Sequence, residues 1–401
     1  MRRINVLFRL VTGLIVFGAN CHISGQSGAA KPEKVYRIVY EIEPNDWYKQ
    51  QADLWKTEIE KNPANPEAWY NYYNANRYAH FEDISSAEKK RKLNEIIEKM
   101  AQAIPDTYEF YLLKYWTTYD LFDLALIEKA YAIDPDRPDT YYPFISHYEI
   151  HGQEDKVREF CQKLYQSRDI APWLINYNYN VLQSTGPNAI LFTNGDNDTY
   201  PAWLLQHVQG VRSDVTIINI SLAAVESYLP HKLKKRNIIL DYKELRQDAF
   251  IIQNGQKSGF SPQRFAQALG KAIADTYPDI PLYFSFTVTH EVIDFFKDNL
   301  YITGLAYRYI KKRIDNLALL QKNFEHEFRL NYLTFDWYDD AFPGEKLRNQ
   351  THLNYVPPMI MLLEHYQLSG ETEKARYWKE LALLLAERSG NKQLIDELKH
   401  K

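Results

Sequence analysis

Two acidic side chains stand two positions apart in Asp196-Asn197-Asp198, and only Asn194-Gly195 separates them from the apolar run 190–193. An Asp-x-Asp spacing can place two carboxylates on one hard cation, because such ions prefer oxygen ligands. Many sugar-nucleotide transferases hold a metal-bound diphosphate through this spacing. Asp196 and Asp198 are therefore candidate metal ligands, and a divalent cation is the only cofactor that the sequence suggests.

A purely structural role for the same turn remains open. Asn194-Gly195 is a strong turn pair, and Asp198 or Thr199 can cap a helix that Pro201 begins. The other carboxylate would then favour the positive end of that helix. The acidic turn is thus either a ligand site or a helix cap.

The elements that must position this turn are short, nearly continuous apolar runs, typical of strands buried on both faces of a parallel sheet. These runs are residues 188–193, 215–220 and 281–287, with a further extended piece at 300–303. Helical stretches separate them, at 201–209, 223–235 and 262–276. The alternation predicts βαβ crossovers and a small Rossmann-like parallel sheet within residues 181–308.

In an open parallel sheet, ligands bind beyond the carboxyl ends of the strands, where the loops converge. The loops at those ends carry carboxylates, amides and hydroxyls, and few cations. We therefore expect a ligand site among Asn194, Gly195, Asp196, Asn197, Asp198, Thr199, Asn219, Ser221, Thr287 and Thr289.

Helical patterns flank the predicted sheet, at 31–180 and 309–401, so the fold class is α/β combined with all-α. Residues 147–157 align without a gap on residues 365–375. In both copies a glycine, Gly152 or Gly370, falls where one helix must end in a left-handed cap. The unit resembles tetratricopeptide repeats, which place a small residue where Ala130 and Ala375 stand and a proline where Pro135 stands. Stacked repeats of this kind bind proteins or peptides.

Residues 1–30 follow the pattern of a signal peptide, with arginines ahead of a short apolar run. Cys21 closes a lipoprotein-like cleavage box, which would give a lipid anchor. Cleavage near Gly25 or Ala30 would instead release a periplasmic protein. We expect a periplasmic or outer-membrane-associated protein that touches a membrane only through such an anchor.

The composition excludes some classes of function. The formal net charge is −4, so there is no basic field to attract nucleic acid. The basic run 232–236 is expected to be a solvated helix end, with binding to an anionic surface as the alternative. The sequence lacks a GxGxxG, a Walker loop, a GxSxG elbow and an HExxH, which favours a non-enzymatic role.

Two blocks resemble a known group of proteins. Residues 188–221 read NAILFTNGDNDTYPAWLLQHVQGVRSDVTIINIS and residues 280–308 read IPLYFSFTVTHEVIDFFKDNLYITGLAYR. Both are similar to the soluble C-terminal region of Bacteroidota membrane proteins that resemble protein O-mannosyltransferases. The resemblance implies a location outside the inner membrane and an α/β unit next to helical repeats. Those relatives carry many transmembrane helices that this sequence lacks, so their transferase activity is not carried over.

These observations favour an envelope adaptor. Its repeats would bind an envelope protein or peptide, while the α/β unit would recognise a small ligand such as a glycan. The alternative is a metal-dependent enzyme of glycan or glycosyl-carrier metabolism that uses Asp196 and Asp198. A third hypothesis is a structural subunit of a secretion or polysaccharide-handling machine.

Overall fold

The computed structural model describes residues 31–80, 85–118, 120–253, 255–335 and 337–401. The expected signal peptide and Cys21 lie outside these residues. The chain forms two compact units, and the boundary falls within one helix, at residues 147 and 148. The helical unit ends at residue 147 and includes residues 343–347, and the sheet unit comprises residues 148–342 and 348–401.

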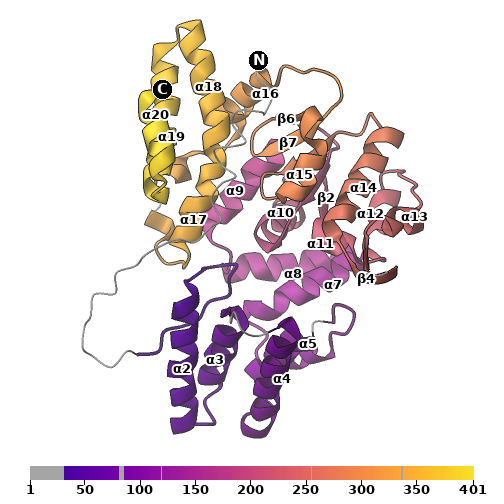
Figure 1. The fold of residues 1–401 in the computed structure, drawn as a ribbon, viewed down its shortest axis with the longest axis vertical. Coiled ribbons are helices and arrows are strands. Elements are labelled where there is room, and N and C mark those ends of the chain that lie inside the picture. The colour runs from indigo at the N-terminus through magenta and orange to yellow at the C-terminus, as the bar shows by residue number, and fades with distance from the viewer. Residues whose placement is uncertain (1–30, 81–84, 119, 254, 336) are drawn as a thin grey trace. The chain divides into compact units, whose positions relative to one another are not determined.

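Figure 1 shows the first helices of the helical unit. Prolines and polar caps set the limits of these helices. The Asn65 side chain accepts the amides of Glu67 and Ala68, and Pro66 takes the first helical position, where no amide donor is needed. Ser85 and Glu88 form a capping box. The helices are α2 (Asn45–Lys61), α3 (Pro66–Tyr78), α4 (Ser86–Ala103), α5 (Tyr108–Thr118), α6 (Ala125–Ile133), η1 (Pro138–Thr140) and α7 (Tyr141–Ile150).

The two aligned helix turns have the same geometry. Gly152 has φ of 67° and Gly370 has φ of 78°, so the predicted left-handed glycine caps are confirmed. In each turn the residue after the glycine donates its amide to the carbonyl of a tyrosine, Tyr148 or Tyr366, at 2.9 Å. The turns join α7 to α8 (Glu154–Ser167) and α18 (Val356–Ser369) to α19 (Thr372–Ser389).

The sheet unit contains a five-stranded sheet in the order β2-β1-β5-β7-β6. The strands are β1 (Ile190–Thr193), β2 (Thr216–Asn219), β5 (Leu282–Ser285), β6 (Leu300–Ile302) and β7 (Ala306–Tyr309). The first three are parallel, with Leu191 paired to both Ile217 and Tyr283, as the sequence predicts.

The rest of the sheet is antiparallel, so the expectation of an all-parallel Rossmann-like sheet is only partly correct. β7 runs antiparallel to both β5 and β6. Only residues 303–305 join β6 to β7, and so short a link permits a hairpin but no crossover helix. The sequence prediction missed β7, and the sheet is mixed.

Helix α10 (Asp196–Gln209) begins earlier than predicted, so the acidic turn forms its first turn. Pro201 lies inside this helix and cannot donate to the carbonyl of Asn197. That carbonyl instead accepts the side-chain amide of Asn178, at 2.8 Å, from α9 (Pro172–Gln183). The side chain of Asn178 thus replaces the missing backbone hydrogen bond, and the helix can extend past the proline.

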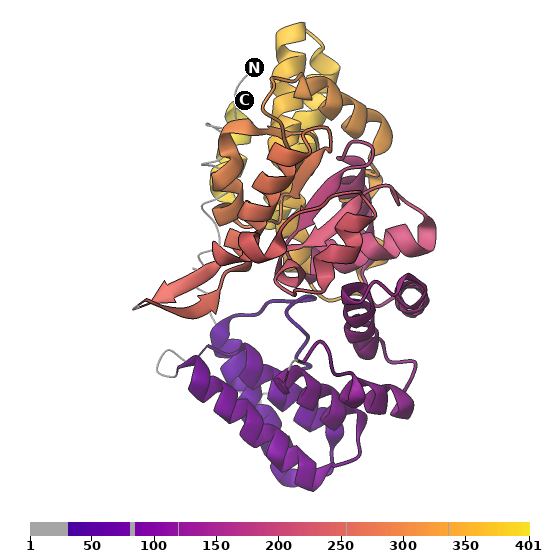
Figure 2. The same cartoon turned by 90° about the vertical axis from the view of Figure 1, so that its right-hand side faces the viewer.

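Two further departures concern the crossover after β2. The predicted helix 223–235 is split into α11 (Ile220–Ala223) and α12 (Tyr228–Lys234). Next come α13 (Tyr242–Gln247) and a hairpin of β3 (Phe250–Gln253) and β4 (Gln256–Phe260), which projects from its unit in Figure 2. The remaining helices are α14 (Pro262–Thr276), α15 (His290–Phe296), η2 (Lys297–Asn299), α16 (Asn316–Lys322), η3 (Asn323–Glu327), η4 (Asn331–Leu333), η5 (Trp337–Asp339), α17 (Glu345–His352), η6 (Leu353–Tyr355) and α20 (Lys392–His400).

Candidate functional site

The carboxyl ends of β1, β2 and β5 converge around Asp198, which is only 2% exposed. Its carboxylate accepts the backbone amides of Asn194 at 2.7 Å and Gly195 at 2.8 Å, and it also accepts the hydroxyl of Thr287. Burial raises the pKa of Asp198, against the opposing effect of these hydrogen bonds. Asp198 therefore ties the start of α10 to the end of β5.

A second set of contacts links β1 to β2 in the same place. The hydroxyl of Thr199 lies 2.8 Å from that of Thr193 and accepts the side-chain amide of Asn219 at 2.9 Å. Asn219 also caps α11 by accepting the amide of Leu222 at 2.9 Å. These side chains are buried, so they join strand ends to helix starts within the sheet unit.

The other predicted residues lie at the rim of this network. Asp196 and Ser221 are exposed, and Asn194, Gly195 and Asn197 are partly exposed. Asp196 and Asp198 thus have unlike surroundings, one exposed to solvent and one enclosed by donors. Within the described residues, no group of three or more His, Cys, Asp or Glu side chains is arranged to hold a metal ion.

Thr289 differs from the other hydroxyl residues at these strand ends. It precedes α15 as the N-cap residue, but its side chain makes no capping hydrogen bond. Its Oγ1 atom is buried, and within the described part of the chain it has no hydrogen-bond partner. A buried hydroxyl without a partner is unusual, since leaving one unsatisfied costs about 1–3 kcal/mol.

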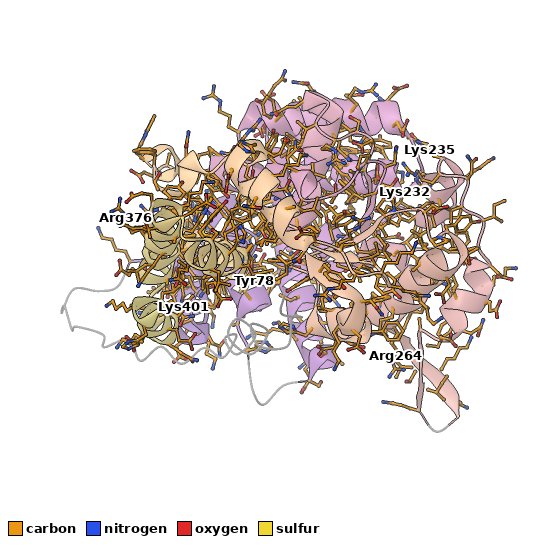
Figure 3. The ribbon with its side chains drawn as sticks, turned by 90° about the horizontal axis from the view of Figure 1, so that it is seen from above. Tyr78, Lys232, Lys235, Arg264, Arg376 and Lys401 are labelled. Carbon is orange, nitrogen blue, oxygen red and sulfur yellow. The ribbon has the colours of Figure 1, made fainter. Side chains whose placement is uncertain are left out.

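The basic run 232–236 is only in part the solvated helix end that the sequence suggests, because Lys234 and Lys235 are exposed but Lys232 is not. Lys232, labelled in Figure 3, forms a buried ion pair with Glu149 and lies 5.6 Å from the ring centre of Trp203. Burial, the largest single effect, lowers the pKa of Lys232, but the Glu149 carboxylate and the Tyr228 hydroxyl together outweigh it, so the pKa is raised. Lys235 pairs with Glu154 at the surface. The run therefore connects α12 to the α7–α8 hairpin.

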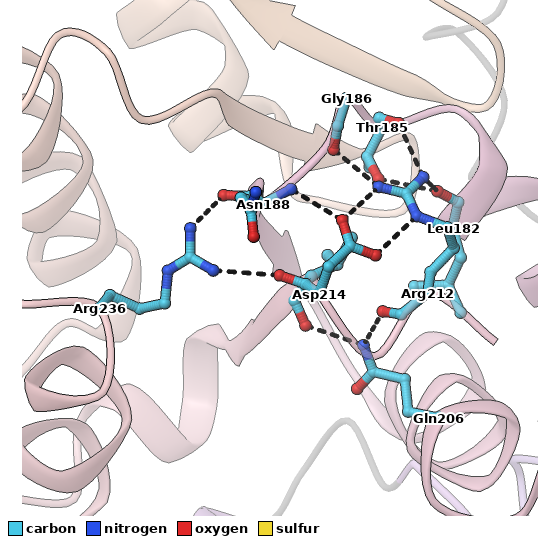
Figure 4. A network of polar contacts seen from close by, with 9 residues as sticks. Leu182, Thr185, Gly186, Asn188, Gln206, Arg212, Asp214 and Arg236 are labelled. Carbon is cyan, nitrogen blue, oxygen red and sulfur yellow. Dashed lines mark hydrogen bonds and ion pairs between the residues drawn. The ribbon is translucent and has the colours of Figure 1, made fainter. Parts of the chain in front are cut away.

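A second polar network closes the opposite, amino end of β1 and β2 (Figure 4). Arg212 donates to both carboxylate oxygens of Asp214, at 2.9 Å each, and this hydrogen bonding lowers the pKa of Asp214 to about 2. Asp214 also accepts the amide of Asn188 at 2.7 Å. The guanidinium of Arg212 further donates to the carbonyls of Leu182, Thr185 and Gly186, which close α9.

The helical unit contains a binding arrangement that the sequence did not reveal. Residues 32–41, here called the strap, precede α2 and form neither helix nor strand. Side chains of α2 and α3 bond to the backbone of the strap. Gln51 accepts the amide of Glu33 and Asn71 accepts the amide of Val35, each at 2.7 Å. The indole of Trp55 donates to the carbonyl of Glu33, also at 2.7 Å.

Two strap side chains point toward the helices. Val35 is fully buried within the core of the helical unit. The guanidinium of Arg37 lies 4.9 Å from the ring centre of Tyr142 and 5.5 Å from that of Trp116. These distances are typical of cation–π contacts. We call Gln51, Trp55, Asn71, Trp116 and Tyr142 the strap site.

Only one sequence feature pointed to this site. The chain is rich in Tyr and Trp, with 31 and 8 residues, but helix packing alone accounts for most aromatic residues at helical spacing. Gln51 and Asn71 are polar residues at buried positions of α2 and α3, and each is only 1% exposed. A polar residue at a core position of a helix is the signal that could have revealed the strap site.

Residues 174–238 match the family model described as TMEM260-associated domain 2, and TMEM260 is an O-mannosyltransferase-like membrane protein. The match runs from α9 to α12, so it contains the first resembling block and the Arg212 network. No curated protein matches the chain. No helix in the described ranges is long and apolar enough to cross a membrane.

Two solved structures are similar to the chain at low identity. The Cut9–Hcn1 hetero-tetramer of the APC/C has 14% identity and a TM-score of 0.25, over 88% of this chain and 52% of that chain. A monomeric IFIT1 mutant with m7Gppp-AAAA has 14% identity and a TM-score of 0.27, over 84% of this chain and 67% of that chain. This chain spans about half the length of the first. Both TM-scores are low, so the fold rests on the elements described above.

Proposed function

We propose that the protein is an adaptor whose helical unit binds an extended segment of another protein. One observation carries this proposal: Gln51, Trp55 and Asn71 bond to the backbone of the strap, a segment that forms neither helix nor strand. Backbone amides and carbonyls are common to every polypeptide, so the same side chains suit a segment supplied by a partner. The side chains that do this are already in place and buried, which lowers the entropic cost of binding.

The proposal includes the cellular location of the adaptor, which is the cell envelope. The signal-peptide pattern of residues 1–30 supports export, and an envelope protein or peptide is then the natural partner. Cell fractionation with the complete chain tests this. Recovery in the periplasm or in the outer-membrane fraction would support export, whereas recovery in the cytoplasm would contradict it. A Cys21→Ser variant that leaves the membrane fraction would show a lipid anchor.

The sheet unit offers a second binding edge at the rim of the Asp198 network. Thr289 carries this part of the proposal. Its buried hydroxyl has no partner among the described residues, and a ligand hydroxyl, such as that of a glycan, would supply one. A glycan array compares wild type with Thr289→Val and Ser221→Ala. Loss of binding in Thr289→Val alone would support the site, and absence of binding in wild type would contradict it.

The peptide-binding function is tested with an array of unstructured ten-residue peptides and two matched variants. Asn71 and Asn76 both lie on α3, are almost fully buried, and donate to the carbonyl four residues earlier, but only Asn71 contacts the strap. We expect wild type and Asn76→Ala to bind a subset of peptides, and Asn71→Ala to lose them. The function would be contradicted if neither wild type nor the variants Gly344→Ala and Arg37→Ala, which loosen the strap, bound any peptide above background.

A further inference from the structure

Successive side chains of the strap lie on opposite sides, as they do in an extended peptide ligand. In an extended chain successive side chains point to opposite sides, so residues two apart share a side. Val35 enters the core and Arg37 lies against Trp116 and Tyr142, whereas Lys34 is exposed and its ammonium lies over the ring of Tyr36. The helical unit therefore contacts one side of the strap, through the apolar side chain of Val35 and the guanidinium of Arg37.

The strap makes two kinds of contact with the helical unit, one that is independent of its sequence and one that depends on it. The bonds from Gln51, Trp55 and Asn71 go to the backbone and would hold any sequence in an extended form. The contacts of Val35 and Arg37 depend on the side chain. Trp116 also lies 5.4 Å from the guanidinium of Arg77, so its ring contacts two cations. An arginine delivered by a ligand would meet an aromatic surface that is already positioned.

We propose that the strap is a resident competitor for its own site, and that the partner is an extended protein segment with an apolar-x-arginine sequence. This inference rests on the proposed peptide-binding function and adds its sequence preference and its regulation. The strap precedes α2 and is held by hydrogen bonds and side-chain contacts to the helices. It can therefore leave while α2 and α3 keep their packing. A partner binds only to the fraction of molecules whose strap has left, which weakens its apparent affinity by that fraction.

One glycine gives access to the strap without altering its sequence or the strap site. Gly344 has φ of 92°, and a Cβ there would overlap the backbone oxygen of Tyr40. A Gly344→Ala substitution therefore pushes the strap outward from its turn at residues 38–40. Arg37→Ala loosens the strap in an independent way, by removing its cation–π contacts.

The experiment measures binding of a fluorescent peptide of sequence PEKVYRIVYE, which copies residues 32–41, to the full chain by anisotropy. We expect Gly344→Ala and Arg37→Ala to bind it about tenfold more tightly than wild type, which corresponds to loss of about 1.4 kcal/mol of strap docking. The same peptide with alanine in place of its arginine should lose about fivefold in affinity for these variants. That loss should disappear when Trp116→Leu is added.

The outcomes separate the two claims. If the loosened variants, shown to be folded by circular dichroism, bind no peptide in this assay or on the array, the peptide-binding function itself fails. If array peptides bind but the loosened variants are no better than wild type, the competitor role of the strap is overturned. If both strap peptides bind equally, the arginine preference is overturned and general peptide binding stands.

Discussion

The backbone amide of Val35 donates to the side-chain oxygen of Asn71 at 2.7 Å, and both residues are almost completely buried. The two lie far apart in sequence, so this bond fixes the strap to α3 and not merely to the start of its own helix. A buried amide that loses its acceptor is destabilised by about 1–3 kcal/mol. The Asn71 side chain is therefore one identifiable part of the attachment of the strap.

Limited trypsin digestion should detect release of the strap. Trypsin cleaves after Arg37, whose side chain lies against Trp116 and Tyr142 while the strap is docked. Because cleavage follows the population of the open form, Asn71→Ala should raise the initial rate of cleavage after Arg37 by about tenfold. Mass spectrometry of the fragments measures this. Asn76→Ala is the control, and equal rates in the two variants would contradict the importance of the Asn71 contact.

The two acids of the predicted metal site should behave differently on substitution. Asp198→Ala removes the acceptor of two backbone amides and of Thr287, and should lower the free energy of unfolding by about 2 kcal/mol. Asp196→Ala removes an exposed carboxylate and should cost less than about 1 kcal/mol. Urea denaturation measures both. Calorimetry with Mg²⁺, Mn²⁺ or Ca²⁺ is the companion test. A heat of binding that is present in wild type and absent in both variants would support a metal site at Asp196 and Asp198.

The two lysines of α12 form a second matched pair. Lys232→Met leaves Glu149 buried without its partner and should destabilise the protein by about 3 kcal/mol. Adding Glu149→Leu should recover most of that loss. Lys235→Ala breaks an exposed pair and should cost below about 1 kcal/mol. Similar losses of stability for Lys232→Met and Lys235→Ala in thermal denaturation would show that the buried ion pair stabilises the protein no more than the exposed pair does.

Acid should weaken the network at the amino end of the sheet. The pKa of Asp214 is about 2 in the folded protein and near 3.8 ordinarily, so its contribution is present above about pH 4 and is lost as the pH falls toward 2. Arg212→Lys cannot maintain the forked contact, and its stability should change less over this range. Denaturation curves between pH 2 and 5 check this. A wild-type slope no steeper than that of Arg212→Lys would be inconsistent with the network.

The sequence predicted the elements whose pattern is local and strong. α14 occupies the predicted stretch 262–276, and the three parallel strands follow the apolar runs. The sequence prediction failed for elements whose limits depend on contacts between residues far apart in the sequence. Pro201 suggested a helix start, but Asn178 satisfies the carbonyl that the proline leaves, and α10 starts earlier. The hairpin of β3 and β4 was missed although Asn254-Gly255 is a typical hairpin turn pair.

The sequence likewise predicted some features of the candidate site and missed others. The convergence of Asp198, Asn219 and Thr287 follows from parallel strands, whose carboxyl ends meet at one edge. That Asp198 would be enclosed and Asp196 exposed could not be predicted, because it depends on where α10 begins. The strap site could not be predicted at all, since Asn71 and Val35 are brought together by tertiary packing alone.

Hydrogen exchange of the strap amides tests the central claim most directly. With the full chain and a saturating concentration of the PEKVYRIVYE peptide, the amides of Glu33 and Val35 should exchange faster, because the peptide takes their acceptors on Gln51 and Asn71. Amides of α2 and α3 should remain protected. Peptide binding that leaves the exchange of Glu33 and Val35 unchanged would show that the peptide binds elsewhere and would contradict the account.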